Sequence, residues 1–411
     1  MFTSASQVII ITPILPLIGE ALGAPESRLG ALVSGYAWML ALAALVMGPI
    51  SDRIGRRRVL LIGAGALALA LALHGLAGSF GVLLAVRVLA GAGGGMLSGA
   101  AVSYVGDFFP YDRRGWATGW VMSGVPFGLV LGIPLGRMLA VAFGFRTPFV
   151  VFAGVMAVAF ALVLTVVPQP EVTREARPVS LGRALARYRG LLAAPAPRAA
   201  VVTFFVMYLG LSLLVVFLPQ WLSERFPLAL APGGVPLRVL GMPVDFIASL
   251  FFVGGLVSVL VGPAAGTLSD RLGRRPLILA SCLGLAVVTA ALTYVVAERW
   301  MAYPLYVLIM ALFGLRMAPL QALLTALVPD QLRGSFLSLT IAVGQIGMGL
   351  GATLSGVLYD GFGYRASTFA SAAFMLLMAA VVWRLLPEPG APDAPAPAIA
   401  AEAPALARSA A

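Results

Sequence analysis

The chain has 411 residues, a formal net charge of +11, one cysteine and one histidine. Hydrophobic residues make up 61% of it and charged residues 10%, with a mean hydropathy of +1.00. A soluble domain would expose too much apolar surface at this composition, so it indicates a membrane protein, and the single Cys and His exclude an internal disulfide and a Cys or His metal cluster.

Twelve apolar segments are long enough to cross a bilayer, which takes about 20 residues. Each is predicted to be a helix, because lipid offers no partner for an unpaired backbone group. The first residues lack the basic region of a removable signal peptide, so we expect the first helix to start almost at once. The predicted spans are residues 2–23, 28–50, 59–78, 81–106, 115–140, 147–167, 199–222, 244–268, 276–297, 301–327, 334–358 and 366–387.

Three short motifs recur in the same order in both parts of the chain. GPISDRIGRRR starts at Gly48, and GTLSDRLGRRP starts at Gly266. The other repeats are Pro-x-x-x-Arg-Gly, at 110–115 and 329–334, and Gly-aromatic-Arg, at 144–146 and 363–365. A duplicated unit explains such a set, so we predict two six-helix bundles, residues 1–167 and 199–387.

A polar stretch, residues 168–198, separates the two predicted halves. Within it, residues 181–192 are typical of a basic amphipathic helix on the inner leaflet, with a calmodulin-type or regulatory site as the alternative. The tail 388–411 is rich in Ala and Pro and is predicted to be disordered. Most arginines fall in loops on one side, which predicts that both termini are cytoplasmic and accounts for the positive charge without a nucleic-acid partner.

A charge within a span costs at least about 2.5 kcal/mol and is a functional candidate by default. Arg87 lies in the fourth predicted span and Arg316 in the tenth. No span contains a central carboxylate, because Glu20 and Asp245 lie near outer ends and Asp107 lies near an inner end. Either one of these three acids carries a coupling proton, or the two arginines bind an anionic substrate, or the arginines only pair with backbone carbonyls.

The fifth predicted span has glycines at four-residue spacing, which clear one helix face for close packing. They are Gly124, Gly128, Gly132 and Gly136, with Pro134 expected to bend the helix. Polar and aromatic residues in other spans are candidates for lining a substrate cavity, although helix packing is the competing interpretation for each. These cavity candidates are Gln7, Tyr36, Ser123, Tyr208, Arg316 and Gln345, whereas His74 is interpreted as structural.

Taken together, these features resemble the major facilitator superfamily over essentially the whole chain. The twice-present pattern Gly-x-x-x-Asp-Arg-x-Gly-Arg-Arg is similar to its signature loop, and RVLAGAG at Arg87 resembles its buried-arginine motif, which is linked to proton coupling. The fifth span resembles the glycine–proline motif of the antiporters, closest to the sugar-efflux and multidrug-efflux branch, but lacks the adjacent Gly-Pro pair. The resemblance implies two bundles around a cavity that opens alternately to either side.

The resemblance also implies that the signature loops act as gating latches. Arg56 would pair with Asp107, while Asp52 would face the eleventh helix. The position equivalent to Asp107 in the second half is Ala326, so we expect the first latch to be the stronger, and a role in topology alone is the alternative. The remaining loop residues are Gly48, Arg53, Gly55, Arg57, Gly266, Asp270, Arg271, Gly273 and Arg274.

We therefore expect a monomeric secondary transporter of the plasma (inner) membrane, not an enzyme, with no cofactor or metal. Its predicted activity is proton-coupled efflux of a sugar-like or hydrophobic small molecule. The coupling candidates are Arg87, Asp107, Glu20 and Asp245. The alternative function is organic-anion transport, with Arg87 and Arg316 binding the substrate.

Overall fold

The computed structural model describes residues 2–109, 117, 120–121, 124, 127–169, 188–226, 238–239, 241–328 and 330–386. Several predictions therefore lie outside the described residues. They concern Ser123, the side chains of Asp52 and Arg53, most of the predicted amphipathic helix, and the tail 388–411.

The described elements fall into two sets in chain order. The first contains α1 (Phe2–Ile9), η1 (Thr12–Ile14), α2 (Leu15–Leu22), α3 (Glu26–Ile54), α4 (Arg56–His74), α5 (Phe80–Phe108), the π-helical turn η2 (Gly128–Gly132), α7 (Ile133–Phe143) and α8 (Thr147–Thr165). The second contains α10 (Pro195–Val215), α11 (Leu218–Arg225), β1 (Arg238–Val239), β2 (Met242–Pro243), α12 (Phe246–Leu272), α13 (Arg274–Val295), η3 (Arg299–Met301), α14 (Ala302–Ala326), α15 (Asp330–Phe362) and α16 (Tyr364–Leu385). Strands β1 and β2 pair antiparallel.

Most of these helices are long and apolar enough to cross a membrane. Within the described ranges, ten helices meet this condition. The segments Phe2–Val8 and Thr12–Leu22, which are bent by 53° relative to each other, add an eleventh if they are counted as one span. The predicted fifth span ends in α7, and its first part is mostly outside the described residues. The prediction of an all-α membrane protein is confirmed, with helix ends within a few residues of those expected.

The loops that contain the signature residues are shorter than the sequence suggests, because most of these residues lie in the flanking helices. Helix α3 continues to Ile54 and α4 begins at Arg56, so Gly55 alone joins them. Gly273 likewise joins α12 to α13, and the two glycines have positive φ angles of 97° and 90°. A side chain disfavours this conformation, which explains why one glycine can end one helix and start the next in both halves.

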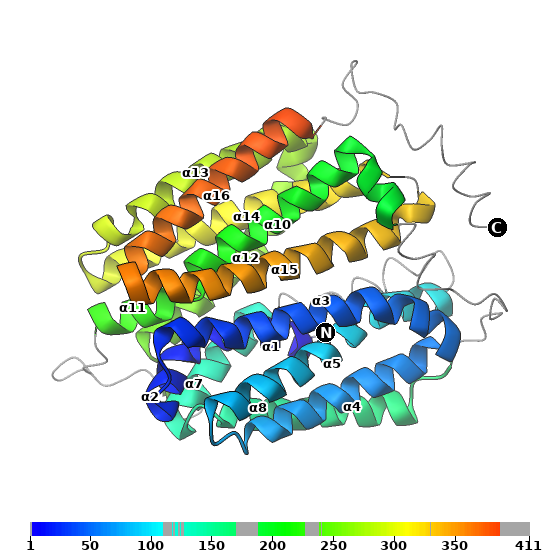
Figure 1. Cartoon of the computed structure of the whole chain (residues 1–411), viewed down its shortest axis with the longest axis horizontal. Coiled ribbons are helices and arrows are strands. Elements are labelled where there is room, and N and C mark those ends of the chain that lie inside the picture. Colours follow the sequence, from blue (N-terminus) through cyan, green and yellow to red (C-terminus); the bar gives the residue numbers. More distant parts are fainter. Residues whose placement is uncertain are drawn as a thin grey trace.

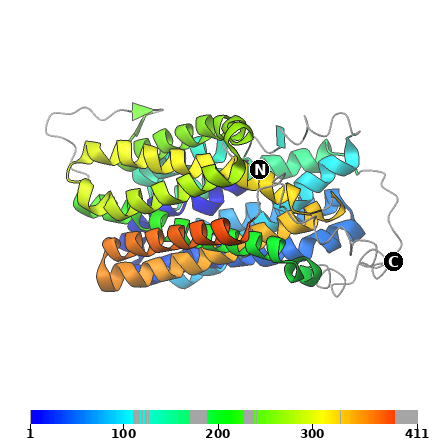
Figure 2. The same ribbon diagram turned by 90° about the horizontal axis from the view of Figure 1, so that it is seen from above.

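The two sets of helices form two bundles that meet along α3 and α15 (Figure 1). Figure 2 shows that helices of both bundles run roughly along the same axis. At this border Ser34 Oγ donates to the Gly349 carbonyl at 2.6 Å and lies 2.7 Å from Thr353 Oγ1. Gly30 lies against the Ala352 carbonyl with no room for a Cβ, so small residues let α3 and α15 approach closely.

The glycine stripe of the fifth span packs against α1 and the residue that follows it. A Cβ on Gly128 or Gly132 would meet Ser6, and one on Gly136 would meet Ile10. Ser6 Oγ also lies 3.2 Å from the Gly128 carbonyl, which it can donate to. A π-helical turn covers Gly128–Gly132, and Pro134 stands in the first turn of α7 that follows.

We predict that Gly132→Ala destabilises the first bundle by about 1–3 kcal/mol, because the added methyl group overpacks the contact with Ser6. The thermal unfolding midpoint in detergent should fall and should partly recover in Ser6→Gly/Gly132→Ala. Gly154→Ala is the matched control, because nothing lies within 4 Å of a Cβ there. Equal effects of the two alanine substitutions would contradict the packing role.

Candidate functional site

The two ends of the double bundle carry different polar groups. One end holds α2, α11, the end of α7 and the start of α12 (Figure 1), and we call it the Asp245 end. The opposite end holds the α3–α4 and α12–α13 junctions, and we call it the Arg56 end. The contacts that join the bundles at the Asp245 end form the candidate site.

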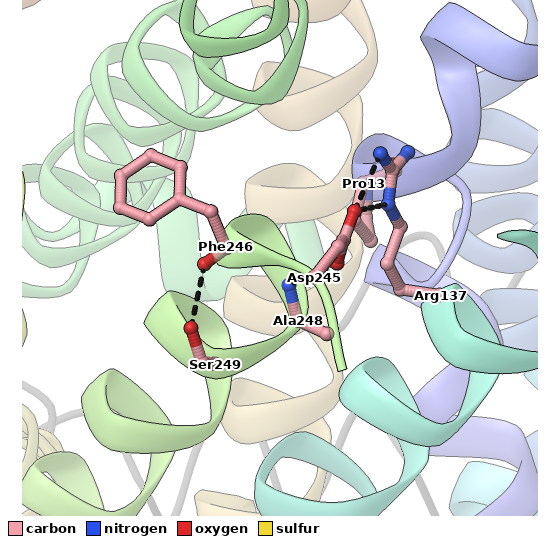
Figure 3. A network of polar contacts seen from close by, with 6 residues as sticks. All are labelled: Pro13, Arg137, Asp245, Phe246, Ala248 and Ser249. Carbon is pink, nitrogen blue, oxygen red and sulfur yellow. Dashed lines mark hydrogen bonds and ion pairs between the residues drawn. The ribbon is translucent and has the colours of Figure 1, made fainter. Parts of the chain in front are cut away.

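An ion pair between Arg137 and Asp245 joins the two bundles. Arg137 Nε and Nη2 each lie 2.8 Å from Asp245 Oδ2, and Figure 3 shows the guanidinium of α7 meeting the carboxylate that precedes α12. The two side chains are only 1% and 4% exposed. A pair so enclosed is little screened by water or salt.

Neighbouring backbone groups fix both members of this pair. Asp245 is the N-cap of α12, and its Oδ1 accepts a hydrogen bond from the Ala248 amide at 2.8 Å. A carboxylate is favoured there by the free amides and the dipole of the helix N-terminus. Arg137 Nη1 also donates to the Pro13 carbonyl of η1 (Figure 3), so the pair ties together three spans from both bundles.

A second contact at the same end brings together two acids from opposite bundles. The amide nitrogen of Gln220 donates to Glu224 of α11 at 2.7 Å and reaches Glu26 of α3 at 3.3 Å. Tyr359 donates to the other oxygen of Glu224 at 2.6 Å. A cavity of about 600 Å³ opens here, lined by Glu26, Trp221, Glu224, Thr293, Tyr359, Asp360, Gly363, Tyr364 and Arg365.

At the Arg56 end, the pair that the resemblance implied is present. Arg56 Nε lies 2.8 Å from Asp107 Oδ2, and the side chains are 18% and 27% exposed. Both residues belong to the first bundle, so the pair braces α4 against α5. At the equivalent place in the second bundle, Arg274 Nη1 donates to the Ala322 backbone carbonyl at 3.2 Å.

Arg87 is fully buried among residues that we had considered for a substrate cavity. Its Nη1 and Nη2 each donate to the Gln7 carbonyl at 3.1 Å, and its Nε donates to Leu32 at 3.3 Å. The guanidinium carbon lies 4.3 Å from the centre of the Tyr36 ring. Gln7 and Tyr36 therefore help to hold Arg87 within the first bundle, although the Gln7 side-chain amide has no hydrogen-bond partner among the described residues.

The other sequence candidates are dispersed. Glu20 is exposed on α2, while Arg316 is fully buried in α14 and faces methionine sulfurs. Tyr208 packs on Gly344 of α15, next to buried Gln345. No group of three or more acidic, His or Cys residues in the described ranges is placed to hold a metal ion.

Sequence reasoning missed Arg137, Glu26 and Glu224 as members of the site. Arg137 lies near the outer end of the fifth predicted span, and neither glutamate belongs to a recognisable motif. The available signal was the presence of ionisable residues at span ends on the side where charges are scarce. Their pairing needed the arrangement of the bundles, because their partners are more than 100 residues away in the chain.

Comparisons with known proteins agree with this architecture. The family model described as Major Facilitator Superfamily matches residues 1–242 and 202–410. The multidrug resistance protein MdtG of Proteus mirabilis is 25% identical over 93% of this chain and 92% of its own, and the uncharacterized MFS-type transporter YceJ of Bacillus subtilis is 23% identical over 95% of both. A crystal structure of a D-xylose–proton symporter has a TM-score of 0.74 at 17% identity, covering 94% of this chain and 95% of its own.

We predict that the two ion pairs contribute unequally to stability. Arg137→Gln should lower the unfolding free energy by about 3–5 kcal/mol, because it leaves Asp245 buried and unpaired. Arg56→Gln should cost at most about 1 kcal/mol, because its pair is partly hydrated. Thermal unfolding of the purified variants measures the difference.

The double variant Arg137→Gln/Asp245→Asn is the control for this comparison. It removes both charges, so it should recover much of the loss seen in Arg137→Gln. Equal losses for Arg56→Gln and Arg137→Gln, or no recovery in the double variant, would show that the buried pair does not hold the bundles together.

Proposed function

Because the chain belongs to the major facilitator superfamily, and is thus a multi-pass membrane transporter and not an enzyme, we propose that it exports a small molecule in exchange for protons. The substrate class that we propose is sugar-like or hydrophobic. Transport would proceed by alternating access, in which the two bundles rock so that each end opens in turn. The protein would work as a monomer.

The observation that carries this proposal is the buried ion pair of Arg137 and Asp245. Its members belong to different bundles, so it holds the Asp245 end closed and has to break before that end can open. The arginines at the α3–α4 and α12–α13 junctions favour a cytoplasmic position for the Arg56 end. On this assignment the termini are cytoplasmic, and the structure corresponds to a state closed to the outside.

At the cytoplasmic end, Arg56 and Asp107 would stabilise the outward-open state. Their ion pair fixes the start of α4 against the end of α5, next to the signature residues of α3. We propose that Asp52 then contacts the eleventh span, which corresponds to α15, and holds the cytoplasmic ends of the two bundles together. The second copy, in which Arg274 meets a backbone carbonyl, would contribute less.

Proton coupling follows from the two acidic contacts at the outer end, which respond to protons in opposite ways. Asp245 must be ionised to pair with Arg137, so its protonation would favour opening. Glu26 and Glu224 approach each other across the two bundles, so their ionisation would favour opening, and a proton on either would favour closure. Closure of the outer end when Glu26 or Glu224 takes up a proton suits export, because protons arriving from outside would return the transporter to its inward-facing state.

The relatives support the direction and the coupling by analogy. MdtG is named as a multidrug resistance protein, and the structural neighbour is a D-xylose–proton symporter. We place export first because the glycine stripe of the fifth span resembles the antiporter motif and packs on the first span. Organic-anion transport is the second candidate, favoured by Arg316, which has no oxygen partner in the described chain.

The two candidates differ in substrate charge. Inside-out membrane vesicles whose lumen is acidified by respiration should accumulate ethidium or radiolabelled lactose, and an uncoupler should abolish this. If the second candidate is right, a radiolabelled aromatic carboxylate should be transported instead, and Arg316→Ala should abolish its transport. Accumulation of ethidium or lactose that survives the uncoupler, or matches vesicles without the protein, would refute proton-coupled export of these classes.

Locking the outer end should stop transport reversibly. Ser34 and Thr353 hydroxyl oxygens lie 2.7 Å apart across the border of the bundles, so a cysteine pair there is within reach of a disulfide. In a Cys282→Ser background, we expect oxidation of Ser34→Cys/Thr353→Cys to abolish accumulation and reduction to restore it. The single Ser34→Cys variant should be unaffected by the oxidant, and transport by the fully cross-linked protein would contradict alternating access at this border.

Glu26→Gln should remove the dependence of outer closure on external pH. The charged and titratable groups around Glu26 at this cavity are Glu224, Asp360, Tyr359, Tyr364 and Arg365. Fluorophores on Ala21→Cys and Ala297→Cys, at exposed positions of the two bundles, would report the outer distance by energy transfer. The distance should shorten on acidification, except in Glu26→Gln.

Glu20→Gln provides the matched control, because it removes the same charge from an exposed position of the same bundle. This variant should keep the response to acid. A pH response that is equal in Glu26→Gln and the parent protein would remove Glu26 from the coupling scheme.

A further inference from the structure

In the part of the chain that the structure describes, three arginines are almost completely enclosed by the protein, and the positive charge of each has different surroundings. Arg87 donates to backbone carbonyls of its own bundle. Arg137 pairs with the carboxylate of Asp245. Arg316, in the second bundle, forms no hydrogen bond or ion pair with any oxygen of the described residues.

The groups around Arg316 are soft and uncharged. Its Nη1 lies 3.0 Å from the sulfur of Met375 and 3.8 Å from that of Met378. Its guanidinium carbon lies 5.1 Å from the centre of the Phe313 ring, and its Nε has no hydrogen-bond partner among the described residues. A thioether is a weak acceptor without charge, so these contacts leave a buried positive charge uncompensated, which is strongly unfavourable.

Arg316 lines a small cavity enclosed by α10, α13, α14 and α16. The cavity has room for about one water-sized particle. Its two hydroxyl groups, on Thr289 and Ser371, donate to the carbonyls of Leu285 and Gly210 at 2.7 Å each. The other lining groups are apolar side chains, so the guanidinium is the only group there with an unused donor.

We propose that this cavity binds one small monovalent inorganic anion, such as chloride, against Arg316. A water molecule could accept a hydrogen bond from Arg316 but would leave its positive charge unbalanced. An anion would accept the same hydrogen bond and also balance the charge. An organic carboxylate has the same charge but does not fit a cavity of this size. The site is separate from the outer contacts and would be occupied whichever way transport runs.

Cys282 provides a direct probe of this site. It is the only cysteine in the chain, it is fully buried, and it interacts with Arg316. Labelling of Cys282 by a maleimide requires local opening of the second bundle, and an anion that binds only the closed form slows it by the factor 1 + [anion]/Kd. At chloride ten times above Kd, we expect the purified full-length protein to be labelled about tenfold more slowly than in gluconate of equal ionic strength.

The variants separate anion binding from general salt effects. Arg316→Gln should abolish the chloride effect, whereas Arg87→Gln, at an equally enclosed arginine, should keep it. Acetate should protect no better than gluconate, because it is too large for the cavity. Protection by acetate equal to that by chloride would assign Arg316 to an organic carboxylate instead, and the same chloride effect in the parent and Arg316→Gln would overturn the proposal.

Equilibrium binding of radioactive chloride to the parent protein gives a second measurement that needs no variant. About one saturable site per chain is expected. No saturable binding would overturn the proposal even if Arg316→Gln fails to fold. Neither measurement depends on transport. A negative result for anion binding would therefore not contradict the proposed export, and a negative result for export would not contradict the anion site.

Discussion

A charge enclosed within membrane-spanning helices has to find its counterpart inside the protein, because lipid cannot solvate it. The chain meets this requirement with carbonyls at Arg87, with a carboxylate of the other bundle at Arg137, and with sulfur and a small cavity at Arg316. The first solution keeps a bundle together, and the second keeps two bundles together. Only the second joins groups that a movement of one bundle against the other would separate.

The two bundles have equivalent glycine junctions, but the side-chain contacts beside these junctions differ. Gly55 and Gly273 have nearly the same backbone conformation, and Gly144 and Gly363 repeat it at the opposite end. Yet the position equivalent to Asp107, which pairs with Arg56, is Ala326 in the second half, where Arg274 donates to the Ala322 carbonyl. A repeated glycine junction therefore does not bring a repeated ion pair between the same two positions.

Much of the fold follows from local sequence, because length and hydropathy define a span without reference to its neighbours. The pairing of Arg56 with Asp107 came from the family resemblance, and the packing role of Gly128, Gly132 and Gly136 from their spacing. The contact of Arg137 with Asp245 did not follow from either, because it depends on how two bundles meet. Gln7 and Tyr36 are cavity candidates from their polarity, with helix packing as the alternative, yet Gln7 contacts Arg87 through its backbone carbonyl and Tyr36 contacts it through its ring, and neither contact could be predicted from the polarity of the side chain.

The one-residue junctions at Gly55 and Gly273 also limit which parts can move separately. Helices α3 and α4 share a single linking residue, and so do α12 and α13, which leaves no slack for one helix to slide past its neighbour. The adjoining ends of each pair must therefore move together, and the signature arginines at the start of α4 and of α13 move with them. A tilt that starts at the Ser34 contact would reach the far end of α3 and shift the start of α4 with it, so the two ends of this helix would change position together without a flexible segment between them.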